Sequence, residues 1–257
     1  MLPTLSAEHL ARQPHFPLRA RIDPERPAHC CSNCTLNRVC LPRHVAARDM
    51  HLLDQMSPVN RRVRRDAALY RSRDAFAALY AVRSGSFKSM GISNGGVSKV
   101  TGFHLPGDLI GAEGIQDDHY CYSVVALEDS EVCRVGYDRL VSSMSTVPGL
   151  QTGLLQMISA DISRDRGLML LLGAMSAEQR VVTFLLSLSR RYAALNYAPD
   201  HFVLRMTRAD IGSYLGLSLE TVSRIFTKLA RESYLSVNQR DIVLKDAEGL
   251  KGRIDCW

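Results

Sequence analysis

The stretch that decides the fold is TRADIGSYLGLSLETVSR, residues 207–224. Thr207 is a favourable N-cap, and Asp210, three residues later, supplies the acidic partner of a capping box. Gly216 provides a turn, and Ser218 can cap a second helix. The spacing therefore predicts two short helices joined by a glycine turn, which is the helix-turn-helix layout. The apolar residues expected to bury together are Ile211, Leu215, Leu217, Val222, Ile225 and Leu229.

The second predicted helix carries a polar face that suits base recognition. Glu220, Ser223 and Arg224 follow the i, i+3, i+4 spacing and so share one surface. Arginine donates two hydrogen bonds to guanine, glutamate accepts one from cytosine, and serine forms one with a base edge. A good bidentate pair gives roughly 1–3 kcal/mol of discrimination between bases. A solvated face of an amphipathic helix is the alternative. Residues 235–237 and 242–244 predict two strands of a wing beside these helices.

A long helix is predicted after Pro148 and Gly149, followed by a second helix over 177–192. Asp165 falls inside the apolar series of the long helix. If two copies pair along that series, two Asp165 carboxylates approach each other and weaken the dimer. A marginal dimer suits a switch, because a small free-energy difference then moves the population. The alternative is that Asp165 points to solvent. The apolar positions are Leu154, Ile158, Ile162, Met169 and Leu172.

A cysteine cluster precedes these helices. Cys31, Cys34 and Cys40 form C-x2-C-x5-C, and closing so short a loop around one metal group costs little entropy. Soft thiolates select zinc, copper(I) or iron–sulfur, and the spacing does not separate these. His29 and His44 flank the cluster and could serve zinc, while inert buried thiols remain the plainer alternative. Candidates for a fourth ligand are Cys30, Cys121, Cys133 and Cys256.

The middle of the chain alternates short apolar runs with turn signals, which predicts a small β sandwich or barrel. The chain has 257 residues, 46% of them hydrophobic, and a net charge of +6, which permits an anionic partner. No apolar run reaches the length of a membrane span and no signal sequence is evident, so we expect a cytoplasmic protein with no membrane partner. The predicted strands cover 78–82, 86–90, 99–104, 123–127 and 131–135.

Four stretches of this chain resemble one known family, the FNR (fumarate and nitrate reduction) regulators within the cyclic-AMP-receptor-protein (CRP/FNR) superfamily. The resemblance implies an α+β fold: an N-terminal cyclic-nucleotide-binding-like β-roll, a long dimerisation helix and a C-terminal winged helix-turn-helix. The stretches are CSNCTLNRVCLP at 31–42, YAVRSGSFKS at 80–89, TGFHLPGDLIG at 101–111 and the opening stretch. The implied division is a flexible lead-in (1–29), a cluster-binding segment with the β-roll sensor domain (30–147), the dimerisation helix (148–175) and the DNA-binding domain (176–257).

The resemblance also implies a function. Cys31, Cys34, Cys40 and Cys133 would hold a [4Fe–4S] cluster that senses oxygen. With the cluster intact, a homodimer would bind TTGAT-like inverted repeats in double-stranded DNA and act with RNA polymerase as an activator. The implied DNA-facing residues are Thr207, Arg208, Ser218, Glu220, Thr221, Ser223, Arg224 and Lys228. The implied dimer switch comprises Ile158, Ile162, Asp165, Met169 and Leu172.

Two departures and two rival functions accompany this interpretation. Where cyclic-nucleotide binders carry an Arg-Ser pair, this chain has Tyr120 and Cys121, so we do not expect cyclic AMP binding. Cys30 and Cys121 are extra thiols. The rival regulator is a superfamily member controlled by a small effector, or by zinc or thiol redox. The rival from another class is a metal-dependent or electron-transfer enzyme, but no catalytic constellation or phosphate-binding loop supports an enzyme.

Overall fold

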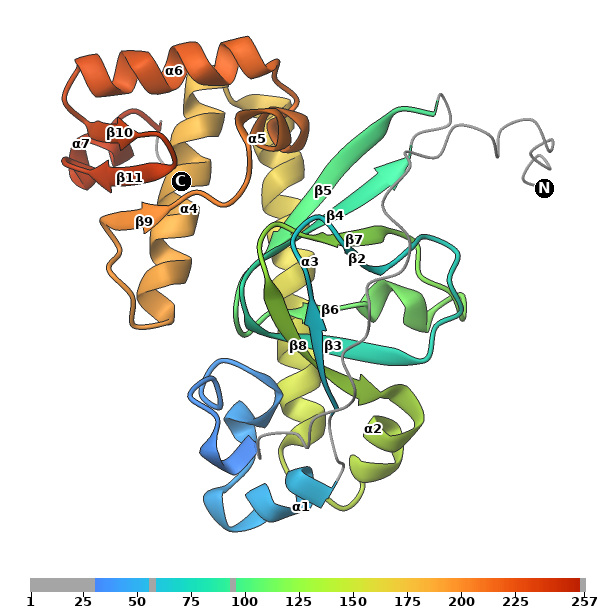
Figure 1. Cartoon of the computed structure of the whole chain (residues 1–257). Coiled ribbons are helices and arrows are strands. Elements are labelled where there is room, and N and C mark those ends of the chain that lie inside the picture. The colour runs from blue at the N-terminus through green and yellow to red at the C-terminus, as the bar shows by residue number, and fades with distance from the viewer. Residues whose placement is uncertain (1–30, 56–58, 93–95, 255–257) are drawn as a thin grey trace.

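The computed structural model describes residues 31–55, 59–92 and 96–254 (Figure 1). A β-roll lies beside the long helix α3 (Leu150–Ala174), and a helical domain with a small sheet occupies the far end of that helix. This arrangement confirms the predicted α+β fold. The predicted lead-in 1–29, Cys30 and Cys256 lie outside the described residues, and the predicted domain boundaries stay a prediction.

The β-roll consists of two four-stranded antiparallel sheets with the orders β1-β8-β3-β6 and β2-β7-β4-β5. All five predicted strands are present, while β1, β2 and β6 were missed because they are short or, in β1, carry Arg61 and Arg62. Gly85 has a φ of 78°, and a Cβ there would lie 2.1 Å from Ser130 Oγ, so the β3–β4 turn requires glycine. The strands are β1 (Val59–Val63), β2 (Ala68–Tyr70), β3 (Ala78–Ser84), β4 (Phe87–Ile92), β5 (Ser98–His104), β6 (Leu109–Ile110), β7 (Ser123–Ala126) and β8 (Ser130–Gly136).

The β-roll interior is filled by aromatic side chains. The ring of Tyr120 stacks on Tyr70 with centroids 3.8 Å apart, and its hydroxyl donates to the Ala78 carbonyl at 2.7 Å. Tyr70 in turn donates to Glu113 at 3.0 Å. The tyrosine that replaces the expected arginine is therefore a buried packing residue of the roll, because its hydroxyl is already satisfied.

The first half of α3 is anchored on the cysteine-bearing segment. Leu150, Leu154 and Met157 are buried there in a cluster with Leu41 and Leu140. Leu154, which belongs to the apolar series of the sequence, thus packs within its own chain. The surrounding short helices are η2 (Cys31–Asn33), η3 (Leu41–His44), η4 (Ala47–Asp49), α1 (Met50–Gln55), η5 (Ala112–Ile115) and α2 (Tyr137–Ser143).

The C-terminal domain confirms the predicted helix caps. Thr207 and Asp210 form a capping box, Ser218 accepts from the Thr221 amide, and Gly216 adopts a φ of 66°. The predicted apolar set is buried or packed against one core, and the two wing strands gain β9 as a third. The elements are α4 (Ala177–Ala194), β9 (His201–Val203), α5 (Arg208–Leu215), α6 (Leu219–Arg231), β10 (Leu235–Asn238), β11 (Asp241–Leu244) and α7 (Ala247–Lys251).

The β-roll and the C-terminal domain are in direct contact through β4 and β5 (Figure 1). Lys88 Nζ lies 2.6 Å from Asp210 Oδ1, and the Val100 amide donates to Ser213 Oγ at 2.9 Å. The Phe103 ring packs against the ring of Tyr214. These contacts hold α5 against the roll and so set the direction in which α6 projects.

Candidate metal centre and nucleic-acid interface

The four predicted cysteine ligands line one small cavity. Three come from the segment 31–40, and Cys133 comes from β8, 93 positions further along the chain than Cys40. The loop that carries the first three is folded by backbone hydrogen bonds, among them Cys34 N–H to the Cys31 carbonyl at 3.2 Å. Most of the remaining wall is apolar. The other residues that line the cavity are Asn37, Leu41, Pro42, Leu53, Ala81, Arg83, Val135, Leu140 and Leu150.

The register of the sheet explains how Cys133 reaches this cavity. Cys133 pairs with Ala81 on β3 and with Asn60 on β1, and its Sγ lies 3.5 Å from Asn60 Oδ1. Because side chains alternate along a strand, Glu131 shares the face of Cys133 on β8. Arg83, two residues after Ala81, lines the cavity itself. The small side chain of Ala81 leaves room beside the sulfur. The pairing partners Asn60 and Ala81, and the neighbouring Arg83, were missed at the sequence level, since nothing in the local pattern reveals strand register.

Burial favours the neutral form of two of these thiols, Cys40 and Cys133. Burial raises the pKa of Cys40 well above its usual range, and the other three thiols raise it further. Burial also raises the pKa of Cys133 to about 11, although the nearby Arg83 guanidinium opposes that shift. Metal ligation requires thiolates, so binding a cationic group here must release these protons.

Four thiols are a donor set of the kind that an iron–sulfur cluster accepts. Within 31–55, 59–92 and 96–254, no three histidine, cysteine or carboxylate side chains are placed to hold one ion. A [4Fe–4S] cluster instead accepts one thiolate at each of four irons, so its ligands surround it. His44 is engaged elsewhere, with Nε2 2.6 Å from Gln156 Oε1. Cys121 is exposed, does not line the cavity, and its Sγ lies 3.8 Å from the Glu113 carbonyl.

The cysteine segment is fitted tightly onto the start of α3. A Cβ at Gly149 would lie 2.0 Å from the His44 carbonyl oxygen, and one at Gly153 would lie 2.4 Å from the Leu41 carbonyl oxygen. Only glycine permits so close an approach of the two backbones. The His44–Gln156 hydrogen bond lies next to this contact. A displacement of the segment that carries Cys40 is therefore transmitted directly to α3.

The rest of α3 exposes an apolar stripe. Leu155, Ile162 and Met169 are 57%, 46% and 71% exposed and recur every seven residues. Ile158 and Leu172 are half-buried beside them, and Asp165 lies between. The apolar series predicted for this helix included Leu154 and missed Leu155, because residue type does not distinguish two neighbouring leucines. A seven-residue repeat of exposed apolar side chains is typical of a helix that pairs with another helix.

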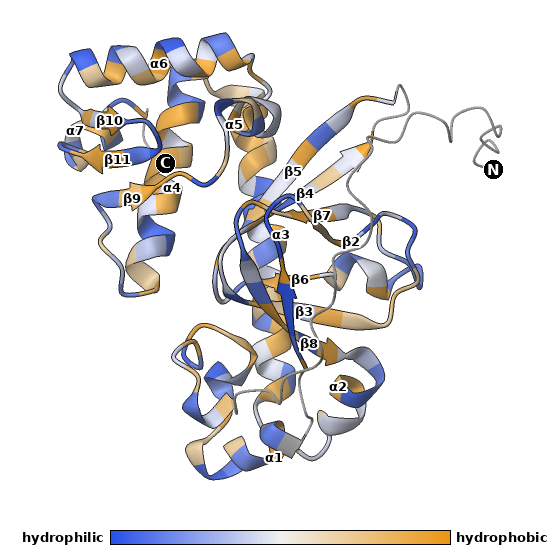
Figure 2. Cartoon of the chain, in the orientation of Figure 1, coloured by the Kyte–Doolittle hydropathy of each residue, from blue (hydrophilic) through white to orange (hydrophobic). Residues whose placement is uncertain are grey.

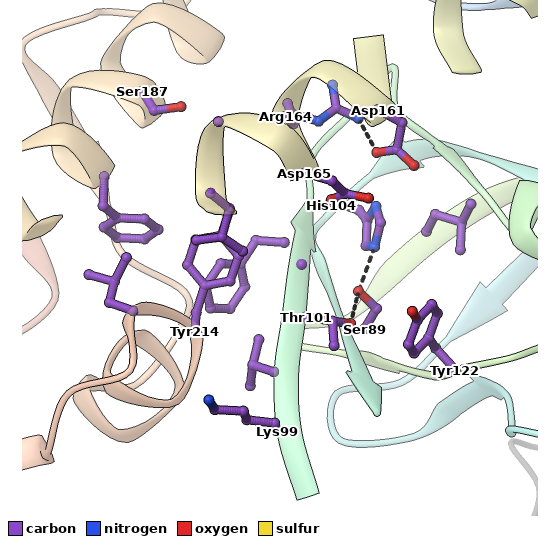
Figure 3. Close-up of a pocket in the computed structure, with 18 of the residues that line it drawn as sticks. Ser89, Lys99, Thr101, His104, Tyr122, Asp161, Arg164, Asp165, Ser187 and Tyr214 are labelled. Atoms are coloured by element: carbon purple, nitrogen blue, oxygen red, sulfur yellow. Dashed lines mark hydrogen bonds and ion pairs between the residues drawn. The ribbon is translucent and has the colours of Figure 1, made fainter. Parts of the chain in front are cut away.

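A second cavity, of about 540 Å³, lies between β4, β5, α3 and the C-terminal domain (Figure 3). His104 is buried in it, with Nε2 3.2 Å from Ser89 Oγ and with Nδ1 unpartnered. Burial lowers the pKa of His104. Arg164 binds Asp161 at 2.7 Å. Asp165 lines this cavity from α3, and its pKa is raised by partial burial and by Asp161.

The candidate nucleic-acid interface is the outer face of α6, at the far end of the molecule from the cysteines (Figure 1). Apolar and polar residues alternate along this helix (Figure 2), and its apolar side is buried against α4 and α5. Glu220 and Arg224 are exposed and Ser223 is half-exposed. The three side chains predicted to read bases are thus accessible from outside the protein.

The remaining predicted DNA-facing residues have contacts within the protein. Thr207 and Ser218 are helix caps, and Arg224 Nη2 lies 3.5 Å from Thr221 Oγ1. The Arg208 guanidinium lies 3.5 Å from the centroid of the Phe226 ring. Lys228 Nζ lies 2.6 Å from Glu178 Oε2 on α4. Their DNA-binding roles stay a prediction.

Comparison with known proteins agrees with this architecture. The family described as the Crp-like helix-turn-helix domain matches residues 179–253, and the family described as the cyclic nucleotide-binding domain matches residues 60–146. The transcriptional regulatory protein btr of Bordetella pertussis is 43% identical over 87% of this chain and 92% of its own length. The transcriptional activator protein FnrA of Stutzerimonas stutzeri is 36% identical over 90% of this chain and 94% of its own.

Among solved structures, FixK2 from Bradyrhizobium japonicum superposes with a TM-score of 0.69 at 30% identity, covering 78% of this chain and 98% of that one. In the part of the chain that the structure describes, no helix has the length and apolarity needed to cross a membrane. The relatives are transcription regulators rather than enzymes. The chain is therefore a DNA-binding transcription regulator, and it belongs to the FNR-type regulators of the CRP/FNR superfamily.

Proposed function

We propose that this regulator senses oxygen through a [4Fe–4S] cluster held by Cys31, Cys34, Cys40 and Cys133. The observation that carries the proposal is that four soft donors, from two segments far apart in sequence, line one largely apolar cavity. When bound, the cluster supplies an oxygen-labile link among four thiolates that otherwise belong to two separate segments. Cys121 is not proposed as a ligand, because it is exposed and does not line this cavity.

The close fit between η3 and α3 supports a route from the cluster to dimerisation. Ligation of Cys40 restrains Leu41, whose carbonyl packs on Gly153 with no space for even a methyl group. Ordering this segment therefore orders the first turns of α3. The stripe of Leu155, Ile162 and Met169 begins within those turns and offers the surface for a second copy of the chain.

Asp165 makes this dimer marginal. It interrupts the apolar stripe of α3, and two copies related by two-fold symmetry bring their Asp165 carboxylates toward each other. The raised pKa of Asp165 already reflects an unfavourable setting for the carboxylate within one chain. The cluster then decides between monomer and dimer, because a small difference in free energy is enough to shift such an equilibrium.

The dimer is proposed to bind a TTGAT-like inverted repeat and to activate transcription with RNA polymerase. Two-fold symmetry of the protein matches an inverted repeat, with one α6 in each half-site. The accessible Arg224 and Glu220 carry the chemistry for guanine and cytosine edges. Ser223 lies between them on the same face of α6, within reach of an adjacent base edge.

The experiment is to purify the protein without air and to measure iron, acid-labile sulfide and visible absorbance. Wild-type protein is expected to contain about four irons and four sulfides per chain, as a [4Fe–4S] cluster requires, and to bleach in air. Cys133→Ser should lose iron and colour, whereas the matched control Cys121→Ser should keep both. Iron-free wild-type protein prepared this way, or equal iron in both variants, refutes the proposal.

A second candidate function is regulation by a small effector in the larger cavity, which is favoured by its volume of about 540 Å³ and by the unpartnered Nδ1 of His104. Zinc at the same cysteines is the related alternative. Cyclic AMP is not the expected effector, because the position where the resemblance would place an arginine is Tyr120, whose ring stacks on Tyr70 in the roll. A colourless protein with one zinc per chain, or an effector that alone induces dimerisation, favours this candidate.

A further inference from the structure

The wall of the cysteine cavity contains one basic side chain among the residues that the structure describes, Arg83. The Arg83 side chain is 22% exposed, and its Nη1 lies 3.4 Å from Oε1 of Glu131, whose side chain is 23% exposed. Both groups are thus largely withdrawn from water, where charges are screened less than at the surface. A charge in this position acts on whatever the four thiols bind.

Arg83 and Glu131 lie close to Cys133 along strands β3 and β8. Arg83 lies two residues after Ala81, which pairs with Cys133, and Glu131 lies two residues before Cys133 on the same strand. On β8 a spacing of two keeps Glu131 on the same face as Cys133. On β3 the register shifts between Val82 and Ser84, and Arg83 is placed on this side of the sheet by its position in the cavity wall. Arg83 itself lines the cavity, whereas Glu131 does not and stands behind the guanidinium.

We propose that Arg83 and Glu131 are positioning residues that set the reduction potential of the iron–sulfur cluster in opposite directions. The inference rests on the proposed function. Four thiolates give the bound cluster a net negative charge, and local charge is one of the factors that set cluster potentials. The Arg83 cation stabilises the more negative, reduced state and so raises the potential. Glu131 neutralises part of that effect and lowers it.

The test is an anaerobic potentiometric titration of the loaded protein, in which a mediator exchanges one electron with the cluster. Arg83→Gln is expected to lower the midpoint potential by about 59 mV, which is a tenfold change in a one-electron equilibrium. Glu131→Gln should raise it, and Arg83→Lys should stay near the wild-type value. A structural role alone does not predict shifts of opposite sign from two variants that each remove one charge.

Air exposure gives a second readout. A bound cluster would be open to oxidation by dioxygen, which would take up one electron and become superoxide, and a lower cluster potential would favour that transfer. The half-life of the visible absorbance in air-saturated buffer should therefore shorten in Arg83→Gln and lengthen in Glu131→Gln, each by several-fold. The control is Arg139→Gln on exposed α2, which removes the same charge but does not line the cavity and should change neither value.

The outcomes separate the two ideas. If wild-type protein prepared without air binds no iron, the proposed function is wrong, and this inference fails with it. Suppose that wild-type protein loads iron normally. Only the inference is then overturned if wild type, Glu131→Gln and Arg83→Lys have equal midpoint potentials and Arg83→Gln has an equal or higher one. If Arg83→Gln does not load, the sign of the Glu131→Gln shift still decides, because that residue does not line the cavity.

Discussion

Gly153→Ala tests whether the cysteine segment and α3 are mechanically joined. At an ordinary helix position this substitution stabilises a protein by roughly 0.5–1 kcal/mol, because glycine has more backbone freedom to lose. Here the added Cβ would lie 2.4 Å from the carbonyl oxygen of Leu41, a backbone atom that cannot rotate away. Overpacking of this kind costs about 1–3 kcal/mol. We therefore expect a net loss of about 0–2.5 kcal/mol in the free energy of unfolding.

Gly167→Ala in the same helix is the matched control. No atom lies within 4 Å of a Cβ placed at Gly167, so this variant should gain the full helix-propensity term of roughly 0.5–1 kcal/mol. The helix propensities cancel between the two variants. Their difference, about 1–3 kcal/mol, then isolates the cost of separating the Leu41 carbonyl from α3.

The assay is urea unfolding of the iron-free protein in reducing buffer, followed by far-ultraviolet circular dichroism at one protein concentration. The iron-loaded Gly153→Ala protein should also lose its visible absorbance faster in air, since Leu41 follows Cys40, one of the proposed ligands. If Gly153→Ala proves as stable as Gly167→Ala, the backbones are not in the contact described, and the proposed route from cluster to dimer fails.

Three further predictions concern the dimer, the interface and the helix cap. Asp165→Ala should dimerise in air, with a dissociation constant at least about tenfold lower than wild type, or about 1.4 kcal/mol, by analytical ultracentrifugation; an oxidised variant that stays monomeric contradicts the role of this carboxylate. Arg224→Ala should lose about 1–3 kcal/mol of preference for the TTGAT-like site in competition binding while keeping salt-dependent non-specific affinity; a uniform loss would assign it to phosphate instead. Thr207→Ala should cost about 1 kcal/mol of stability by thermal unfolding, and no change would mean that the cap is replaced by water.

Much of this protein could be inferred from local patterns. The capping box at Thr207, the turn at Gly216 and the cap at Ser218 depend only on residues a few positions apart, so the helix-turn-helix was predictable residue by residue. The spacing of the three clustered cysteines likewise predicted a thiolate site, and their role as ligands stays a prediction. Short-range patterns can be interpreted from the sequence, because backbone geometry fixes which neighbouring residues come into contact.

The tertiary structure decided what depends on register and packing. Whether Cys133 or Cys121 joins the other thiols is set by pairing of β8 with β3, since a shift of one residue would turn Cys133 to the opposite face. The place of Arg83 in the cavity wall depends on the same pairing of β3 with β8. The close contact of Gly153 with Leu41 depends on how α3 docks against the cysteine segment. Sequence determined the elements and their chemistry, whereas only the fold determined which distant side chains share a site, because strand register and helix docking are settled by the whole core at once.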